Sequence, residues 1–110
     1  SLGRNATKLV EQSVSPEFSE KFDVRIGDID MNQHVNNVRY IDWAYNTFSI
    51  EHFKSYFPKR VVVNFNAEGK ANDSIIASRF QNSQDESIVE IANASNGKNL
   101  CRLMFEWGKI

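Results

Sequence analysis

The sequence is poor in several residue types, and each shortage excludes a class of protein or site. Its 110 residues contain one cysteine, Cys101, so neither an internal disulfide nor a cysteine-based zinc site can form within one chain. No apolar run approaches the roughly 18 residues of a membrane-spanning helix, and the polar N-terminus lacks the apolar segment of a signal peptide. Lysine and arginine (13) nearly balance aspartate and glutamate (14). We therefore expect no membrane insertion, no nucleic-acid binding, and a reducing compartment.

The composition is that of one soluble globular domain. Hydrophobic residues make up 41% and charged residues 25% of the chain. A chain of this length buries about two-thirds of the surface that it exposes when unfolded, which leaves little material to cover both faces of a sheet. Residues 1–16 are polar and weakly patterned, so we interpret them as an N-terminal arm or linker and residues 17–110 as a single domain.

Hydrophobic periodicity predicts several strands. Phe22, Val24 and Ile26 lie at alternate positions, which indicates a half-buried strand over residues 17–26. The later part of the chain shows the same alternation in segments divided by turn residues. Further strands are expected over residues 61–66, 74–80, 87–93 and 100–107.

Between the first two strands the pattern changes to that of a helix. From Val38 to Phe48 the apolar residues recur at spacings of three and four, as in an amphipathic helix. We expect this helix to begin at Asn36 or Asn37, whose side chain caps it, and to run for about four to five turns, to about Tyr56. Because helices and strands do not alternate along the chain, the order favours an α+β fold, an antiparallel sheet curled around one helix.

The segment from Asp28 to Asn37, just before the predicted helix, is the densest polar stretch of the chain. Asp30, Asn32 and His34 have the same parity, so in an extended stretch a carboxylate, an amide and an imidazole would point to one side. Such a set suits an active-site entrance. From composition alone, the same residues also suit a structural turn and a helix cap.

The segment Asp28–Trp43, Asp-Ile-Asp-Met-Asn-Gln-His-Val-Asn-Asn-Val-Arg-Tyr-Ile-Asp-Trp, resembles the signature of the acyl-ACP (acyl carrier protein) thioesterases of plants and bacteria. Phe65–Glu68 followed by Asp73-Ser74 resembles the second active-site strand of this family, and Glu106-Trp107 resembles its final strand. The resemblance implies the hotdog fold, an antiparallel sheet of about five strands wrapped around one long central helix. Family members carry two hotdog repeats, and this chain resembles the C-terminal, catalytic repeat. Residues 1–16 would then be the linker between repeats.

The resemblance also implies an activity and its residues. The expected reaction is the hydrolysis of fatty acyl thioesters, foremost those of acyl carrier protein, and the site residues carried over are Asp30, Asn32, His34 and Glu68. Glu68 would be the general base on water, and His34 would hold that water or share its proton. Asn32 would position water or the carbonyl, and Asp30 would orient a neighbour or stabilise charge.

Three further residues are expected to stabilise the oxyanion. Val35, Asn36 and Asn37 lie at the start of the predicted helix, where backbone N–H groups lack helical partners and the helix dipole favours negative charge. Neither a metal nor another cofactor is expected. Cys101 falls on the apolar side of the last predicted strand, so we interpret it as core packing and not as a nucleophile.

Two other functions stay open. One is an acyl-CoA thioesterase acting as a homodimer, and the other is a non-catalytic binding or assembly half that needs a missing repeat. In each case we expect the chain to form a homodimer or to pair with a second hotdog repeat. The expected location is the cytoplasm of a bacterium or the plastid stroma of a plant.

Overall fold

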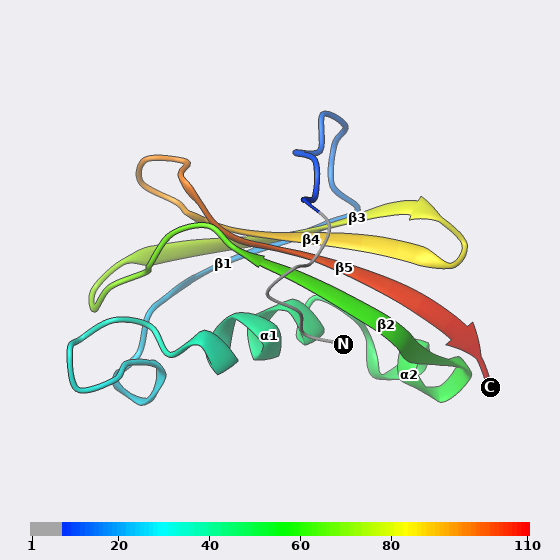
Figure 1. The fold of residues 1–110 in the computed structure, drawn as a ribbon, viewed down its shortest axis with the longest axis horizontal. Helices are drawn as coiled ribbons and strands as arrows, with labels where there is room; N and C mark the ends of the chain where they lie inside the picture. Colours follow the sequence, from blue (N-terminus) through cyan, green and yellow to red (C-terminus); the bar gives the residue numbers. More distant parts are fainter. Residues whose placement is uncertain (1–7) are drawn as a thin grey trace.

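The computed structural model describes residues 8–110, which form one antiparallel sheet with two helices against one face (Figure 1). The sheet has the strand order β1-β3-β4-β5-β2. Its strands are β1 (Phe18–Asp23), β2 (Tyr56–Phe65), β3 (Ser74–Ser83), β4 (Glu86–Asn93) and β5 (Asn99–Lys109). Between β1 and β2 lie a 3₁₀ turn, η1 (Ile26–Asp28), and the helices α1 (Asn37–Tyr45) and α2 (Ile50–Ser55). The α+β architecture with a five-stranded antiparallel sheet is confirmed. Neither helix is long and apolar enough to cross a membrane.

The main core lies between the helices and the sheet. Along β5, alternate side chains point into it, as the sequence predicts, and they pack with Tyr40, Trp43 and Ala44 of α1. Cys101 is fully buried among them. Burial raises the pKa of the Cys101 thiol to about 12, so this residue is a packing element and not a thiolate nucleophile.

The single long helix expected from the periodicity is wrong, because the helical segment is broken at residues 46–49. The Thr47 hydroxyl donates to the carbonyl of Ala44 (2.7 Å), and Ser49 Oγ accepts the N–H of His52 (3.1 Å) and thereby caps α2. Polar side chains of this kind compete for backbone hydrogen bonds and end helices. The apolar spacing continues across this break, so the sequence pattern does not reveal it.

Strand boundaries also differ from expectation, among them the end of β1 and the start of β2. The first strand ends at Asp23, and Ile26 lies outside it, 90% exposed. The cause is local, because the Asp28 carboxylate accepts the N–H of Arg25 (2.8 Å) and turns the chain into η1. At the other side of the sheet, β2 begins before Pro58, where a register shift occurs. Proline is tolerated there because β2 is an edge strand.

The opposite face of the sheet carries a second apolar cluster of Val62, Phe80, Ile88 and Met104, and Leu9 packs against it. The chain before β1 runs over this face (Figure 1). It is held there by two hydrogen bonds, from the N–H of Leu9 to Asn64 Oδ1 (2.7 Å) and from the N–H of Gln12 to Glu90 Oε2 (3.0 Å). The division at residue 17 stays a prediction, and residues 1–7 lie outside the described part of the chain.

Leu9→Ala should lower the free energy of unfolding by about 1–2 kcal/mol, because a half-buried leucine leaves the apolar cluster partly uncovered. The measurement is urea unfolding. Val10→Ala is the matched control, since Val10 is 76% exposed, and its effect should stay within about 0.5 kcal/mol. Equal effects of the two variants would contradict the contact between the arm and the sheet.

His52 lies inside an aromatic cluster at the junction of α2 and β5. Its ring stacks on Tyr56 at 5.0 Å and meets Trp107 edge-on at 4.2 Å between centroids. Its Nε2 atom is buried without a hydrogen-bond partner within residues 8–110. Burial lowers the pKa of His52, and the charge of Arg79 lowers it further.

This lowered pKa predicts a loss of stability in mild acid. Because the unfolded chain takes up the histidine proton first, near pH 6.5, the folded state loses stability as the pH falls below that value. His52→Phe should therefore lose less stability than the wild type between about pH 7.5 and about pH 5.5. Chemical unfolding at the two pH values measures the difference, and parallel curves for the wild type and His52→Phe would refute the assignment.

Candidate active site

The segment Asp28–Asn37 folds into a tight turn in front of α1. Asp30 Oδ1 accepts the backbone N–H groups of Asn32 (2.9 Å) and His34 (3.1 Å), so one carboxylate oxygen holds the turn together. Gln33 closes it with a φ of +62°. Residues other than glycine rarely adopt this left-handed conformation, which occurs in tight turns and is enriched at functional sites.

The expectation of an extended stretch is therefore wrong, and the equal parity of Asp30, Asn32 and His34 does not place them on one side. The turn bends the chain between Asp30 and His34, and Asn32 lies within the bend, exposed. The carboxylate of Asp30 is occupied by backbone amides. His34 and Glu68 nevertheless lie side by side, for a different structural reason.

Backbone groups of the turn pair with those of the loop that follows β2. His34 forms an isolated antiparallel bridge with Lys70, and the Gly69 carbonyl accepts the N–H of Val35 (2.9 Å). As a result, Glu68 lies next to His34, with 3.2 Å between Glu68 Oε2 and His34 Nδ1. The pairing brings together an imidazole and a carboxylate that are far apart in the sequence.

The His34 and Glu68 side chains can act together on water. They are 36% and 69% exposed, so solvent reaches both. A histidine whose Nδ1–H donates to a carboxylate keeps Nε2 free to accept a hydrogen bond or a proton. Asp30, His34, Val35, Asn36, Asn37 and Glu68 line one cavity of about 290 Å³. Asn32 is the one predicted site residue that does not line it.

The backbone N–H groups before α1 are mostly occupied, which corrects two of the expected oxyanion donors. The N–H of Val35 donates to Gly69 O (2.9 Å), and that of Asn36 donates to Asp28 O (2.8 Å). The Asn36 side chain caps the helix by accepting the N–H of Val38 (3.2 Å). Within residues 8–110, the N–H of Asn37 has no acceptor. Asn37 is thus the first-turn amide that remains available to an anion.

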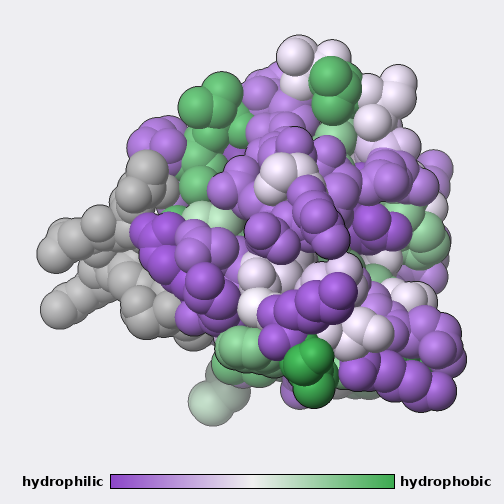
Figure 2. Space-filling model, turned by 90° about the vertical axis from the view of Figure 1, so that its right-hand side faces the viewer, coloured by the Kyte–Doolittle hydropathy of each residue, from purple (hydrophilic) through white to green (hydrophobic). Residues whose placement is uncertain are grey.

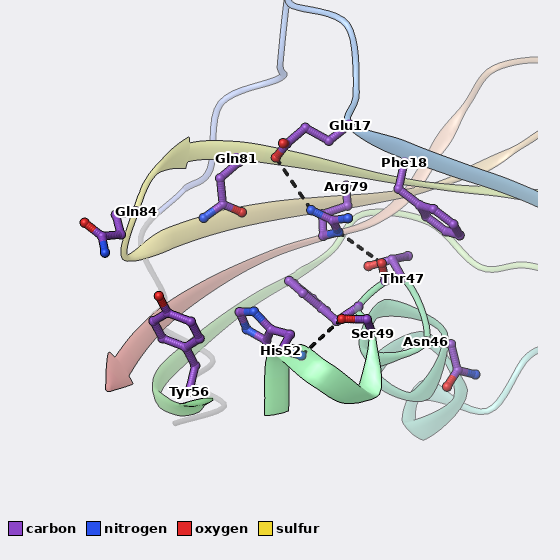
Figure 3. Close-up of a pocket in the computed structure, with 11 residues that line it drawn as sticks. Glu17, Phe18, Asn46, Thr47, Ser49, His52, Tyr56, Arg79, Gln81 and Gln84 are labelled. Carbon is purple, nitrogen blue, oxygen red and sulfur yellow. Dashed lines mark hydrogen bonds and ion pairs between the residues drawn. The ribbon is translucent and has the colours of Figure 1, made fainter. Parts of the chain in front are cut away.

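A larger cavity of about 550 Å³ opens beyond the other end of α1 (Figure 3). Arg79 lies in its wall, where Nε donates to the Thr47 carbonyl (3.0 Å), Nη1 lies 3.6 Å from a Glu17 carboxylate oxygen, and the guanidinium covers the Phe48 ring at 5.2 Å. The charge of Arg79 is therefore already matched. The sequence did not indicate this cavity, because Phe48 and His52 belong to the apolar helical stripe and the rest of the lining comes from segments that lie far apart in the chain.

Neither cavity has the donor set of a metal site. Among residues 8–110, no group of three or more histidine, cysteine, aspartate or glutamate side chains is placed to hold a metal ion. The chemistry that the His34 and Glu68 side chains support is proton transfer to and from water, beside an amide without an acceptor among residues 8–110.

Solved structures of similar fold include two acyl-ACP thioesterases. The 12:0-ACP thioesterase from Umbellularia californica has a TM-score of 0.86 at 20% identity, covering 94% of this chain and 40% of that chain. An acyl-ACP thioesterase from Bacteroides thetaiotaomicron has a TM-score of 0.84 at 25% identity, covering 96% and 42%. The predicted hotdog fold is thus confirmed.

A curated relative, the chloroplastic oleoyl-acyl carrier protein thioesterase 2 of Arabidopsis thaliana, is 32% identical over 73 residues, which are 66% of this chain and 20% of the relative. The chain therefore spans about a fifth of that relative's length. Residues 11–109 match the family described as the acyl-ACP thioesterase C-terminal domain. Because this match covers nearly the whole sequence, the chain belongs to the acyl-ACP thioesterase C-terminal domain family.

Proposed function

We propose that this chain is the catalytic half of a thioesterase that hydrolyses fatty acyl thioesters, foremost those carried by acyl carrier protein. The observation that carries the proposal is the 3.2 Å contact between His34 Nδ1 and Glu68 Oε2 beside the start of α1. The family match and the acyl-ACP thioesterases of similar fold support the same reaction. The length of the acyl chain stays open, since the similar proteins are named for different ones.

In this mechanism the His34 and Glu68 pair activates water. Glu68 or His34 takes a proton from a water molecule in the cavity, and the water oxygen attacks the thioester carbonyl carbon. The N–H of Asn37 stabilises the resulting oxyanion. When the tetrahedral intermediate collapses, the carbon–sulfur bond breaks, the proton passes to the sulfur, and a fatty acid and a free thiol leave.

Two polar residues of the turn have supporting roles in the proposal. Asp30 acts as the acceptor that fixes the turn, because both of its hydrogen bonds go to backbone amides of the turn. Asn32, exposed within the bend, positions the carbonyl or water from outside the cavity. Both roles require the turn to keep its shape while the substrate binds.

We also propose that the chain pairs with a second hotdog unit along β2, as a homodimer or with another repeat. The strand is an edge of the sheet and exposes Phe57 and Phe65, each 46% accessible, while Val38 is exposed on α1. The end of the molecule that carries α2 and the C-terminus has a mostly hydrophilic surface with scattered apolar groups (Figure 2). If the source is a plant, we infer the plastid stroma, and if it is a bacterium, the cytoplasm.

Glu68→Gln should lower the rate of thiol release by about 10²–10⁴-fold, because the amide cannot accept the proton from water. The assay uses a medium-chain acyl-ACP and the matching acyl-CoA, and the ACP substrate should give the higher kcat/KM. Glu51→Gln is the control, since Glu51 is exposed and pairs only with Lys54 among residues 8–110. Undiminished release by a folded Glu68→Gln variant would overturn the catalytic role.

Sedimentation of the chain at micromolar concentration should give the mass of a dimer. Phe65→Lys should shift it to the monomer, since a lysine on an edge strand opposes strand pairing. Phe18→Lys is the matched control, because Phe18 is partly exposed on β1, the opposite edge. A monomeric wild type would exclude the homodimer and leave pairing with another repeat.

A further inference from the structure

Tyr40 is a member of the main core whose side chain carries a polar atom. The residue is 1% exposed, and its ring meets Trp43 edge-on at 5.5 Å. Its hydroxyl oxygen accepts the backbone N–H of Gly69 at 2.7 Å. Burial raises the pKa of Tyr40, so the hydroxyl stays neutral. A phenylalanine would fill the same space, so packing alone gives no reason for the hydroxyl.

The hydroxyl holds the peptide group that follows Glu68. The N–H that it accepts belongs to the peptide between Glu68 and Gly69, and the next carbonyl, that of Gly69, accepts the N–H of Val35 (2.9 Å). Two successive peptide groups are therefore fixed, one by α1 and one by the turn in front of it. Removal of either bond would leave a buried polar group unpaired.

Gly69 is packed closely enough that a side chain there would be crowded. A Cβ atom there would lie 3.0 Å from Val35 Cγ2 and 3.2 Å from the Tyr40 hydroxyl. The Glu68 side chain, by contrast, is 69% exposed, and its ion pair with His34 is a contact to a side chain that is itself partly exposed. The position of the carboxylate therefore depends on the backbone beneath it more than on side-chain packing.

From these contacts we propose that Tyr40 is a positioning residue: by accepting the Gly69 N–H, its hydroxyl keeps the Glu68 carboxylate within reach of His34. The inference rests on the proposed thioester hydrolysis and adds a residue that does not touch water or substrate. Tyr40 lies on α1, so it also ties the helix whose first amide receives the oxyanion to the loop that carries the base.

Tyr40→Phe removes the hydroxyl and keeps the ring. The expected result is a fall in kcat of about tenfold with KM changed less than about twofold, because the base is displaced while the binding surface is retained. Tyr45→Phe is the matched control. Tyr45 lies on the same helix with its ring against Phe105, and its hydroxyl has no hydrogen-bond partner within residues 8–110, so kcat should be unchanged.

The same substitution in a Glu68→Gln background separates positioning from general destabilisation. If the hydroxyl acts through Glu68, Tyr40→Phe should change the residual rate of that background less than about twofold. An equal tenfold fall in both backgrounds would overturn the inference, because it would mean that the hydroxyl acts independently of the carboxylate.

A readout without catalysis is the NMR signature of the His34 ring, assigned with the His34→Asn variant. The ring ¹⁵N and ¹H shifts in Tyr40→Phe should move toward those of Glu68→Gln, and those in Tyr45→Phe should stay at the wild-type values. Wild-type shifts in Tyr40→Phe would overturn the inference. These shifts test the positioning role of Tyr40 whatever the rate at which the chain hydrolyses thioesters. Failure of this inference and failure of the proposed function can therefore be told apart.

Discussion

The site depends on one short stretch of backbone pairing between two loops. Two backbone hydrogen bonds join the turn before α1 to the loop after β2 and form the bridge of His34 with Lys70: the Val35 N–H donates to the Gly69 carbonyl (2.9 Å), and the Ala71 N–H donates to the Gln33 carbonyl (3.0 Å). Backbone groups that would otherwise be exposed at a sheet end are satisfied in this way. The strands and α1 set the distance over which this pairing can form.

Much of the fold was predictable because its signals are local. Alternation along β5 correctly separates Cys101, Leu103 and Phe105 on the core face from Met104 on the other face. Asn96-Gly97 lies in the turn between β4 and β5, where Gly97 has a φ of +75°. Each of these features is decided by a few adjacent residues, so a single sequence suffices to read it.

The predictions that failed concern features that periodicity does not report. A helix break at Thr47 and Ser49 leaves the apolar spacing intact. The positive φ at Gln33 bends a segment for which the parity argument assumes an extended backbone. The amides of Val35 and Asn36 are unavailable because the carbonyls of Gly69 and Asp28 accept them. The meeting of His34 with Glu68 followed from the family resemblance, since no local pattern links residues so far apart. Their roles in catalysis stay a proposal.

Pro58 has a consequence for assembly. The outer edge of β2 offers unpaired backbone groups to any added strand, but Pro58 lacks an N–H, and the register shifts between it and Arg60. An added strand therefore finds a regular ladder only along Val61–Phe65, about 17 Å of backbone. A regular edge this short limits edge-to-edge association, and the alternation of its side chains sets the register of any strand added there.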